Sequence, residues 1–400
     1  MDSHTQRAAV NEALDALCDA HDPKTTPPEQ FWAAQFDAGL AWVWFPEGAG
    51  GLGVSPELQH HVNREIVARG GTVENRLTNI LGIGMGAATI VAHGTDTQIA
   101  RYLKPMFTCE EIWCQLFSEP GAGSDLAALA TSAVKDADRW VINGQKVWNT
   151  LAHVADFGLL VARTDPNVAK HAGLTYFIVD MHQDGVDVRP LYQITSEAEF
   201  NEVYLTDVAL EDTMRLGDVG AGWSVAMTTL ANERVAIGGN APARSEGIIA
   251  QAITAFRDAR ERGDTDPVWE DQLMAHWVEA ETLRLTTLRA NTASWTGTPG
   301  PEGSTSKLQW AELNKAVSSF TLELLGPAGV TYPRGYTFDR PTEPGLSSTD
   351  PHHAFLRSRA NSIEGGTSEI MRNILGERVL KLPGEPRVDK DVAWRDVPRN

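Results

Sequence analysis

The sequence has only three cysteines, Cys18, Cys109 and Cys114, among its 400 residues. Their small number and irregular spacing exclude a disulfide framework and a zinc cluster. Cys114 lies inside an apolar run, so we expect it to be buried as a small hydrophobic residue. The cysteines therefore carry no chemistry in our interpretation.

Metal-binding patterns are missing among the histidines as well. The pairs His60–His61 and His352–His353 have no acidic partners at ligand spacing. We therefore expect surface or helix-capping residues at these positions, and no metal site.

Long hydrophobic runs and excess positive charge are also absent. No early apolar stretch has the form of a signal peptide, and none is long enough to span a bilayer. The 34 basic and 53 acidic residues give a net charge of −19, which leaves no basic field for nucleic acid or anionic lipid. Any polyanionic ligand must be held by helix N-termini or single arginines. We expect a cytoplasmic enzyme.

The periodicity of apolar residues changes twice along the chain. It is helical to about Glu110, with Gly94 ending one helix and Thr95 and Gln98 forming a capping box for the next. From about Glu111 it changes to short β-type runs separated by turns, which predict a small antiparallel barrel or sandwich ending near Leu210. These runs are IWCQLFS, RWVINGQKVWNT, FGLLVART, LTYFIVDM, GVDVRPLYQI and NEVYLTDVAL.

Helical patterns return at Trp223 and continue to about Leu382. Asp350 and Pro351 have the form of an N-cap followed by a proline in the first helical position. The order predicts a mainly α protein with a middle β-domain. We place an N-terminal helical domain at 1–110, the β-domain at 111–212, a C-terminal helical bundle at 213–383 and a polar surface tail at 384–400.

Four spaced motifs carry the chemistry. The first, QLFSEPGAGSDLAAL (115–129), has glycines that let a ligand approach the backbone, although by itself a Pro-Gly turn explains it. It is followed by INGQKVWNT, ANERVAIGG and IEGGTSEIMRNILGERVL. Together, over residues 30 to 385, these motifs resemble the acyl-CoA dehydrogenases. That resemblance implies a helical N-domain, a middle β-domain and a C-terminal four-helix bundle.

The resemblance implies bound FAD and oxidation of an acyl-CoA thioester to the trans-2-enoyl-CoA, as in β-oxidation of fatty acids and lipids. Trp148 covers one face of the flavin in this interpretation, although its alternative is a residue of the barrel core. Thr150 bonds the polar edge of the ring, and Gly123 and Ser124 approach the pyrophosphate. The implied cofactor contacts are Gln115, Leu116, Phe117, Ser118, Gly123, Ser124, Trp148, Thr150, Thr367 and Glu369.

The catalytic base is the main question. In many relatives it immediately precedes Gly-Thr-Ser, but here IEGGTSE has Gly365 at that position and Glu364 one residue earlier. One residue of helix turns a side chain by about 100°, so we keep Glu364 only as the alternative base. A branch of the family has its base in Leu-x-x-Glu-Arg, which LANER matches at Glu233. Glu233 and Arg234 otherwise form a charged surface pair.

We therefore expect Glu233 to be the base, with a pKa raised by partial burial. The resemblance assigns polarisation of the thioester carbonyl to the backbone N–H of Gly365, in an oxyanion-hole arrangement. It assigns substrate contacts to Arg234 and Ser124.

The sequence departs from the family in the half of the flavin site that a partner subunit completes. The usual Arg-x-x-Phe-Gly turn is replaced by RDARERGDTDP, and LLGPAG has Pro327 in place of a glycine. The segment from Tyr332 to Asp350 is unusually rich in proline and glycine, and we expect it to shape the pocket or an interface. The resemblance implies a homo-oligomer (dimer or tetramer) and an electron-transfer flavoprotein as electron acceptor.

Two other functions remain open from the sequence. One is a non-catalytic, structural partner subunit in a hetero-oligomeric acyl-CoA dehydrogenase. The other is a flavin monooxygenase or oxidase on the same fold. Neither acyl-chain length nor acyl type can be inferred from the sequence.

Overall fold

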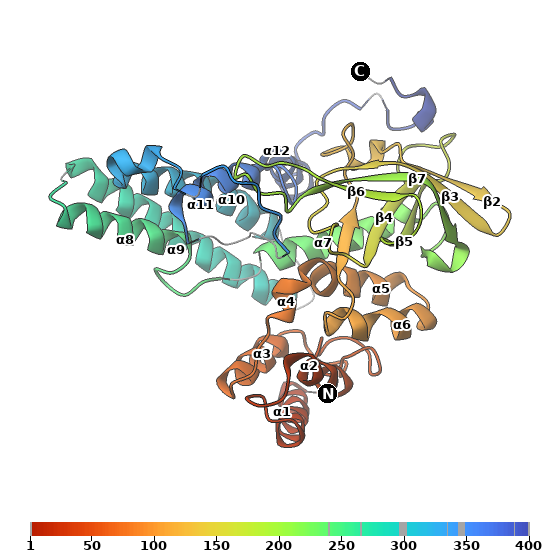
Figure 1. The fold of residues 1–400 in the computed structure, drawn as a ribbon, viewed down its shortest axis with the longest axis horizontal. Coiled ribbons are helices and arrows are strands. Elements are labelled where there is room, and N and C mark those ends of the chain that lie inside the picture. The colour runs from red at the N-terminus through yellow and green to blue at the C-terminus, as the bar shows by residue number, and fades with distance from the viewer. Residues whose placement is uncertain are drawn as a thin grey trace.

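The computed structural model describes residues 2–238, 241–264, 266–295, 302–333, 335–342, 349–387 and 389–398, and it describes their side chains except at 233–238, 291–295 and 302. Figure 1 shows a helical N-terminal region, a β-sheet region and a bundle of long helices. Among the described residues, no helix is long and apolar enough to cross a membrane. No group of three or more metal-ligating side chains occurs among them either.

The N-terminal region is built from short amphipathic helices. The predicted capping box at Thr95 and Gln98 is confirmed at the start of α6, and Gly94 is the C-cap of α5. The elements are α1 (Ser3–Ala20), α2 (Pro28–Asp37), α3 (Leu58–Ala68), α4 (Asn75–Thr78), η1 (Gly82–Gly86), α5 (Ala87–His93) and α6 (Asp96–Phe107).

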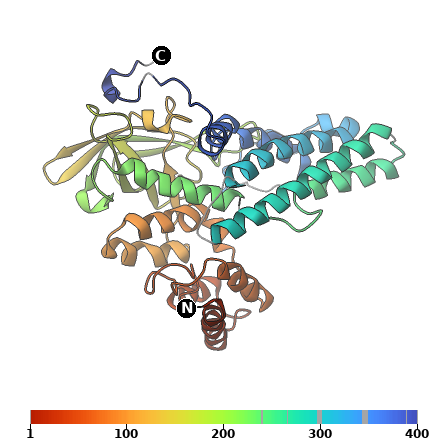
Figure 2. The same cartoon turned by 180° about the vertical axis from the view of Figure 1, so that it is seen from behind.

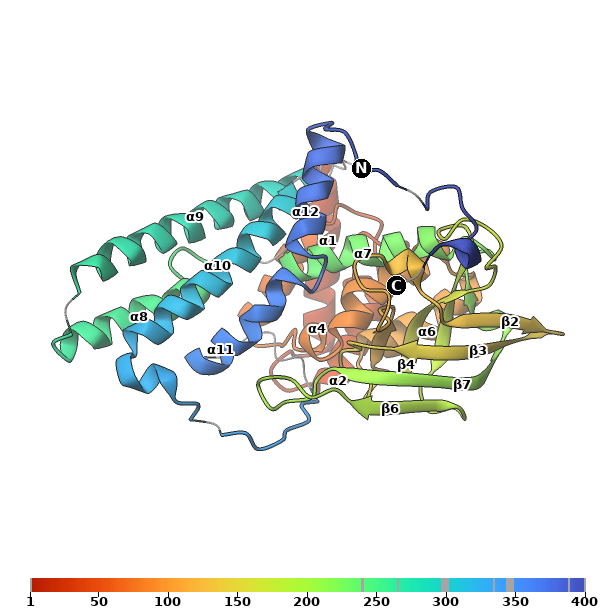
Figure 3. The same cartoon turned by 90° about the horizontal axis from the view of Figure 1, so that it is seen from above.

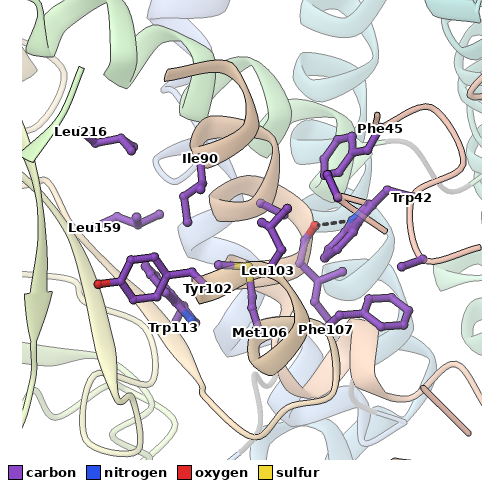
Figure 4. Packing of buried hydrophobic residues seen from close by; sticks show 14 of the residues in the cluster. Trp42, Phe45, Ile90, Tyr102, Leu103, Met106, Phe107, Trp113, Leu159 and Leu216 are labelled. Atoms are coloured by element: carbon purple, nitrogen blue, oxygen red, sulfur yellow. Dashed lines mark hydrogen bonds between the residues drawn. The ribbon is translucent and has the colours of Figure 1, made fainter. Parts of the chain in front are cut away.

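One hydrophobic core joins this region to the sheet. Figure 4 shows Trp42 packed beside Phe107, with its indole N–H donating to the carbonyl of Ile83 at 3.1 Å. On the sheet side Tyr102 of α6 meets Trp113 edge to face, with 5.3 Å between ring centroids. The N-terminal helices therefore pack directly against the first strand.

The β-region is a mixed sheet and not the purely antiparallel structure that the sequence predicts. Its order is β6-β7-β3-β2-β4-β5-β8, and β1 pairs with β4 in parallel, as β2 does at one position. The strands are β1 (Trp113–Leu116), β2 (Ser132–Asp136), β3 (Arg139–Lys146), β4 (Phe157–Arg163), β5 (Leu174–Asp180), β6 (Val186–Pro190), β7 (Asn201–Glu211) and β8 (Arg215–Leu216). Cys114 is fully buried between them, as predicted.

The prediction also misses β2 and β8. β2 buries only Ala133 and β8 only Leu216, so neither has the apolar alternation on which the prediction rests. Short 3₁₀ turns, η2 (Leu126–Ala128) and η3 (Asp212–Met214), connect the strands.

The C-terminal region begins with α7, which passes between the sheet and α5 (Figure 2). The Thr229 hydroxyl of α7 is buried within 3.0 Å of both Thr89 Oγ1 and the Tyr176 hydroxyl. The further elements are α7 (Gly222–Gly238), α8 (Ile248–Glu261), α9 (Pro267–Trp295), α10 (Glu302–Leu324), η4 (Gly326–Val330), α11 (Pro351–Ser358), η5 (Arg359–Ser362), α12 (Ser368–Asn373), η6 (Ile374–Val379) and η7 (Trp394–Asp396).

Helices α8, α9 and α10 have a separate hydrophobic core, which includes Ala252, Val317 and Phe320. The predicted start of α11 is confirmed, because the Asp350 side chain caps the helix and Pro351 is its first residue. Figure 3 shows α11 and α12 alongside α10, on the side of the bundle that meets the sheet. This arrangement brings the last motif of the sequence close to the β-domain.

Candidate active site

The first two motifs of the sequence lie side by side in the β-domain. The side-chain N–H of Asn149 donates to the carbonyl of Gln115 at 2.7 Å, and the backbone N–H of Val147 donates to the carbonyl of Ser118 at 2.9 Å. Leu116 and Phe117 are buried, whereas Gln115 and Ser118 are half-buried at the end of β1. The structure therefore brings the segments 115–118 and 146–149 together, as the resemblance implies.

A buried ion pair holds these two segments in place. The Lys146 ammonium, with no exposed area, donates to the Glu119 carboxylate at 2.8 Å and to the carbonyls of Phe117 and Val161 at 2.9 Å. The Glu119 carboxylate also accepts from the N–H groups of Ala130 and Thr131. Burial alone would raise the pKa of Glu119, but Lys146 and these donors together hold it below its ordinary value.

Trp148 and Asn149 follow this ion pair. Trp148 has φ +62°, its side chain is 58% exposed, and its ring meets that of Phe200 edge to face, at 5.8 Å between centroids. It is not a core residue. Asn149 exchanges backbone hydrogen bonds with Asn201 at 3.0 Å in both directions. This exchange holds the backbone next to Trp148, whose positive φ non-glycine residues rarely adopt.

These residues suit a flavin. The indole offers a free aromatic face, and the buried Oδ1 of Asn149 has no hydrogen-bond partner among the described residues. An unpaired buried acceptor is costly unless a ligand supplies the donor. Gly121 and Gly123 have open space where a side chain would lie, and a hollow of about 320 Å³ adjoins Gly121. Ser124 is exposed on the same loop, and Thr150 is half-buried.

The Pro/Gly-rich segment after η4 packs against the same region. The backbones of Asp339 and Ser196–Ala198 form two hydrogen bonds, and the guanidinium of Arg340 donates to Asn201 Oδ1 at 2.9 Å. His153 lies between Asn201 and the carbonyl of Pro341. The segment therefore supports Asn201, which in turn supports Asn149.

The glycine turn of the last motif lies between η5 and α12. Gly365 and Gly366 have φ values of +62° and +92°, which glycine adopts without strain. The buried Lys307 ammonium of α10 donates to the carbonyls of Asn361 at 2.8 Å and Gly366 at 2.6 Å. Thr367 caps α12 by accepting from the N–H of Ile370, and Glu369 is an exposed residue of its first turn.

Glu364, just before this turn, is held in an ion pair. Its two oxygens lie 3.1 and 2.9 Å from Nη1 and Nη2 of Arg357, and one oxygen also accepts from Asn361 at 2.7 Å. Arg357 reaches the β-domain as well, 3.2 Å from Glu199 and over the ring of Phe200. Since Phe200 contacts Trp148, Arg357 links the glycine turn to the flavin segment.

The expectation for His353 is wrong. It is 3% exposed, and its Nε2 lies 2.7 Å from a carboxylate oxygen of Glu197. The two residues are 156 positions apart, so sequence spacing cannot reveal the pair. His352 is not the cap of α11 either, because its backbone N–H donates to the Asp350 side chain, which is the N-cap.

Glu233 and Arg234 belong to α7, but their side chains lie outside the described residues. The last described side chain before them is that of Asn232, whose amide donates to the carbonyl of Thr228. The structure therefore places the backbone of Glu233 in α7 but does not describe the contacts of its carboxylate.

Comparison with known proteins identifies the family. The sequence matches the N-terminal, middle and C-terminal domains of acyl-CoA dehydrogenase over residues 3–110, 114–208 and 220–380. The chain belongs to the acyl-CoA dehydrogenase family. It is therefore an oxidoreductase of acyl-CoA thioesters from an FAD-dependent family whose members act in lipid and fatty acid catabolism.

Several relatives match most of the chain. It is 37% identical over 353 residues to the acyl-CoA dehydrogenase IpdE1 of Mycobacterium tuberculosis, covering 88% of this chain and 86% of that one. It is 37% identical over 359 residues to FadE34 of the same organism, covering 89% of this chain but 47% of the relative. A solved structure of the ChsE4–ChsE5 complex from M. tuberculosis superposes with a TM-score of 0.68 at 26% identity, covering 96% and 99% of the two chains.

Sequence reasoning missed Lys146, Glu119, Lys307, Arg357 and Asn201. Lys146 occurs inside the quoted motif INGQKVWNT, but its pattern does not distinguish a buried lysine from an exposed one. The other four have contacts with segments at least 27 residues away, as Glu119 has with Lys146 and Arg357 has with Glu199. No signal in a single sequence would have revealed them.

Proposed function

We propose that this chain converts an acyl-CoA thioester to the trans-2-enoyl-CoA, with Glu233 as the general base that takes a proton from Cα. The observation that carries this assignment is the ion pair between Glu364 and Arg357. Proton abstraction by Glu364 would neutralise one partner of this pair and leave Glu199 as the remaining carboxylate beside the Arg357 guanidinium. Glu364 therefore has a structural role in this proposal.

The position of Glu233 in α7 supports its role. It follows Thr229 by four residues, and Thr229 is buried between α5 and β5. Residues four apart lie on the same face of a helix. Helical geometry therefore favours the same face of α7 for position 233 as for Thr229, which supports the proposal.

The remaining roles follow the family. Bound FAD supplies the acceptor for the hydride that leaves Cβ. The segment 115–118, Gly123, Ser124, Trp148 and Thr150 would hold it, with Asn149 supplying a buried acceptor. The N–H of Gly365 would polarise the thioester carbonyl, from a turn that Lys307 fixes. Arg234 and Ser124 would contact the substrate, and an electron-transfer flavoprotein would reoxidise the flavin.

Two isosteric substitutions test the assignment. Glu233→Gln should leave a folded, yellow protein whose flavin is no longer bleached by acyl-CoA under anaerobic conditions. Glu364→Gln keeps the shape of the side chain and one of its two acceptor oxygens, and it should retain most of that bleaching. A bleaching rate lost in Glu364→Gln and kept in Glu233→Gln would overturn the proposal. The acyl-CoA panel used for the titration also identifies the preferred acyl group.

A second candidate is a structural partner subunit in a hetero-oligomer. Two relatives favour it. This chain matches about half of FadE34, and the similar solved structure is a complex of two different proteins, ChsE4 and ChsE5. The missing Arg-x-x-Phe-Gly turn fits this candidate as well. A visible spectrum of the purified chain separates the two, because a folded, colourless protein supports the structural subunit and bound flavin supports the enzyme.

A further inference from the structure

The end of the chain returns to the β-domain. Residues 389–397, which we call the C-terminal strap, lie against the connection between β4 and β5 (Figures 1 and 2). The backbone N–H of Trp394 donates to the carbonyl of Val168 at 2.8 Å, and that of Arg395 donates to Pro166 at 3.0 Å. Ala393 and Ala169 form an antiparallel bridge. The expected surface tail is thus bound by backbone hydrogen bonds at a defined register.

Trp394 connects the strap to the residues behind the glycine-rich loop. Its indole N–H donates to the carbonyl of Ala128 at 3.1 Å, and its ring lies 4.2 Å from the guanidinium carbon of Arg163. Arg163 is 3% exposed and donates to the carbonyls of Ala127 and Leu129. Trp394 and Arg163 therefore both bind carbonyls of the turn η2 or of Leu129 just after it, and η2 directly follows Ser124 and Asp125.

Lys170 makes a second connection. Its ammonium lies 2.7 Å from a carboxylate oxygen of Asp125 and forms an ion pair with Asp389 of the strap. The Lys170 side chain is 13% exposed, whereas Asp125 is 55% exposed. Asp125 is thereby tied through one lysine to a residue 264 positions later in the chain.

The loop 120–125 has few anchors of its own. Glu119 and Ala122 exchange backbone hydrogen bonds at its start, but Gly121, Gly123 and Ser124 are exposed. No described side chain fills the space beside the two glycines. A loop this open loses conformational freedom when it binds a ligand, and fixing it beforehand removes part of that cost. The anchors at Asp125 and η2 fix its far end.

We propose that the C-terminal strap preorganises the 120–125 loop to bind the pyrophosphate of FAD, so that residues outside the family's motifs set the affinity for the cofactor. This inference rests on the proposed function for one point, the assignment of Gly123 and Ser124 to the pyrophosphate. Asp389, Trp394 and Lys170 are positioning residues in it.

The test measures FAD affinity and not turnover. FAD is titrated into the full-length apoprotein, and binding is followed by quenching of flavin fluorescence. Removing residues 387–400 should raise the Kd for FAD about tenfold, and Trp394→Ala and Asp389→Asn should raise it less. Asp391→Asn makes the same charge change two residues later, at an exposed position, and should leave the Kd unchanged.

Melting of the apoprotein distinguishes preorganisation from general stabilisation. The proposal expects the variants to keep a folded apoprotein at the titration temperature while the Kd rises. It is overturned if truncation lowers the melting temperature but leaves the Kd unchanged, or if Asp389→Asn and Asp391→Asn have equal effects. A wild-type apoprotein that binds no FAD would overturn the cofactor assignment as well. If Glu233→Gln keeps its bleaching, the proposed base is wrong but the proposal for the strap is unaffected.

Discussion

A buried lysine lies in each of the two parts of the candidate site, the flavin segments of the β-domain and the glycine turn. The two lysines bind different kinds of group. Lys146 ties the segment after β1 to β3 and β4, and its charge is matched by the buried carboxylate of Glu119. Lys307 binds two carbonyls of one short segment, those of Asn361 and Gly366. The first lysine supports a whole domain, whereas the second supports the shape of one turn.

The comparison separates stability from catalysis. In the β-domain, the charged pair lies among three strands and cannot move without disturbing the sheet. In the glycine turn, the lysine binds two carbonyls and so fixes the direction of the backbone, which includes the N–H assigned to the substrate carbonyl. We therefore expect substitutions at Lys146 to unfold the protein and substitutions at Lys307 to slow the reaction.

The largest effect is expected for Lys146→Met. The change leaves the Glu119 carboxylate buried without its cation, which costs about 3–5 kcal/mol of unfolding free energy. FAD binding should be lost with it. Urea unfolding measures the first effect and flavin absorbance the second.

Lys135→Met on β2 is the matched control, because Lys135 is exposed and its ammonium lies over the ring of Trp140. Its substitution should cost less than about 1 kcal/mol. Equal unfolding midpoints for the two variants would contradict the role of Lys146.

Lys307→Met should lower the unfolding free energy less than Lys146→Met does, and its main effect should be on turnover. Losing the two carbonyl contacts frees the glycine turn, and a displaced turn should lower kcat on the order of a hundredfold while FAD remains bound. Stopped-flow reduction of the bound flavin by acyl-CoA measures this step.

Lys315→Met on the same helix is the control, since Lys315 pairs with half-exposed Glu312 at 2.9 Å. Such surface pairs contribute about 1 kcal/mol or less. The distinction between the two lysines fails if Lys307→Met loses its flavin but reacts normally when FAD is supplied in excess.

The smallest effect concerns acid stability. The folded-state pKa of Glu119 lies below the value of about 4.3 that an unfolded chain has. Its contribution to stability is therefore complete above that value and is lost as pH falls through the folded pKa. Glu119→Gln should reduce the loss of unfolding free energy between about pH 5 and about pH 3. An unchanged pH slope, measured by urea unfolding, would show that other carboxylates control acid unfolding.

Local signals in the sequence are enough for the helical elements and their ends. The capping box at Thr95 and the N-cap at Asp350 depend on residues within four positions of each other, and both are confirmed. The strands are predicted less well, because β1 and β2 pair in parallel with a distant strand and β2 buries a single residue. The family motifs gave the fold and the cofactor but left the base to be proposed.

The sequence by itself determined the order of helices and strands, the positions of the glycine-rich loop and the glycine turn, and membership of the family. Those properties follow from short-range periodicity, capping chemistry and motif order. Only the tertiary structure decided that Glu364 pairs with Arg357, that Lys146 and Lys307 are buried, and that Trp394 returns to η2. Burial and charge pairing depend on which distant segments meet, and packing of the whole chain settles that.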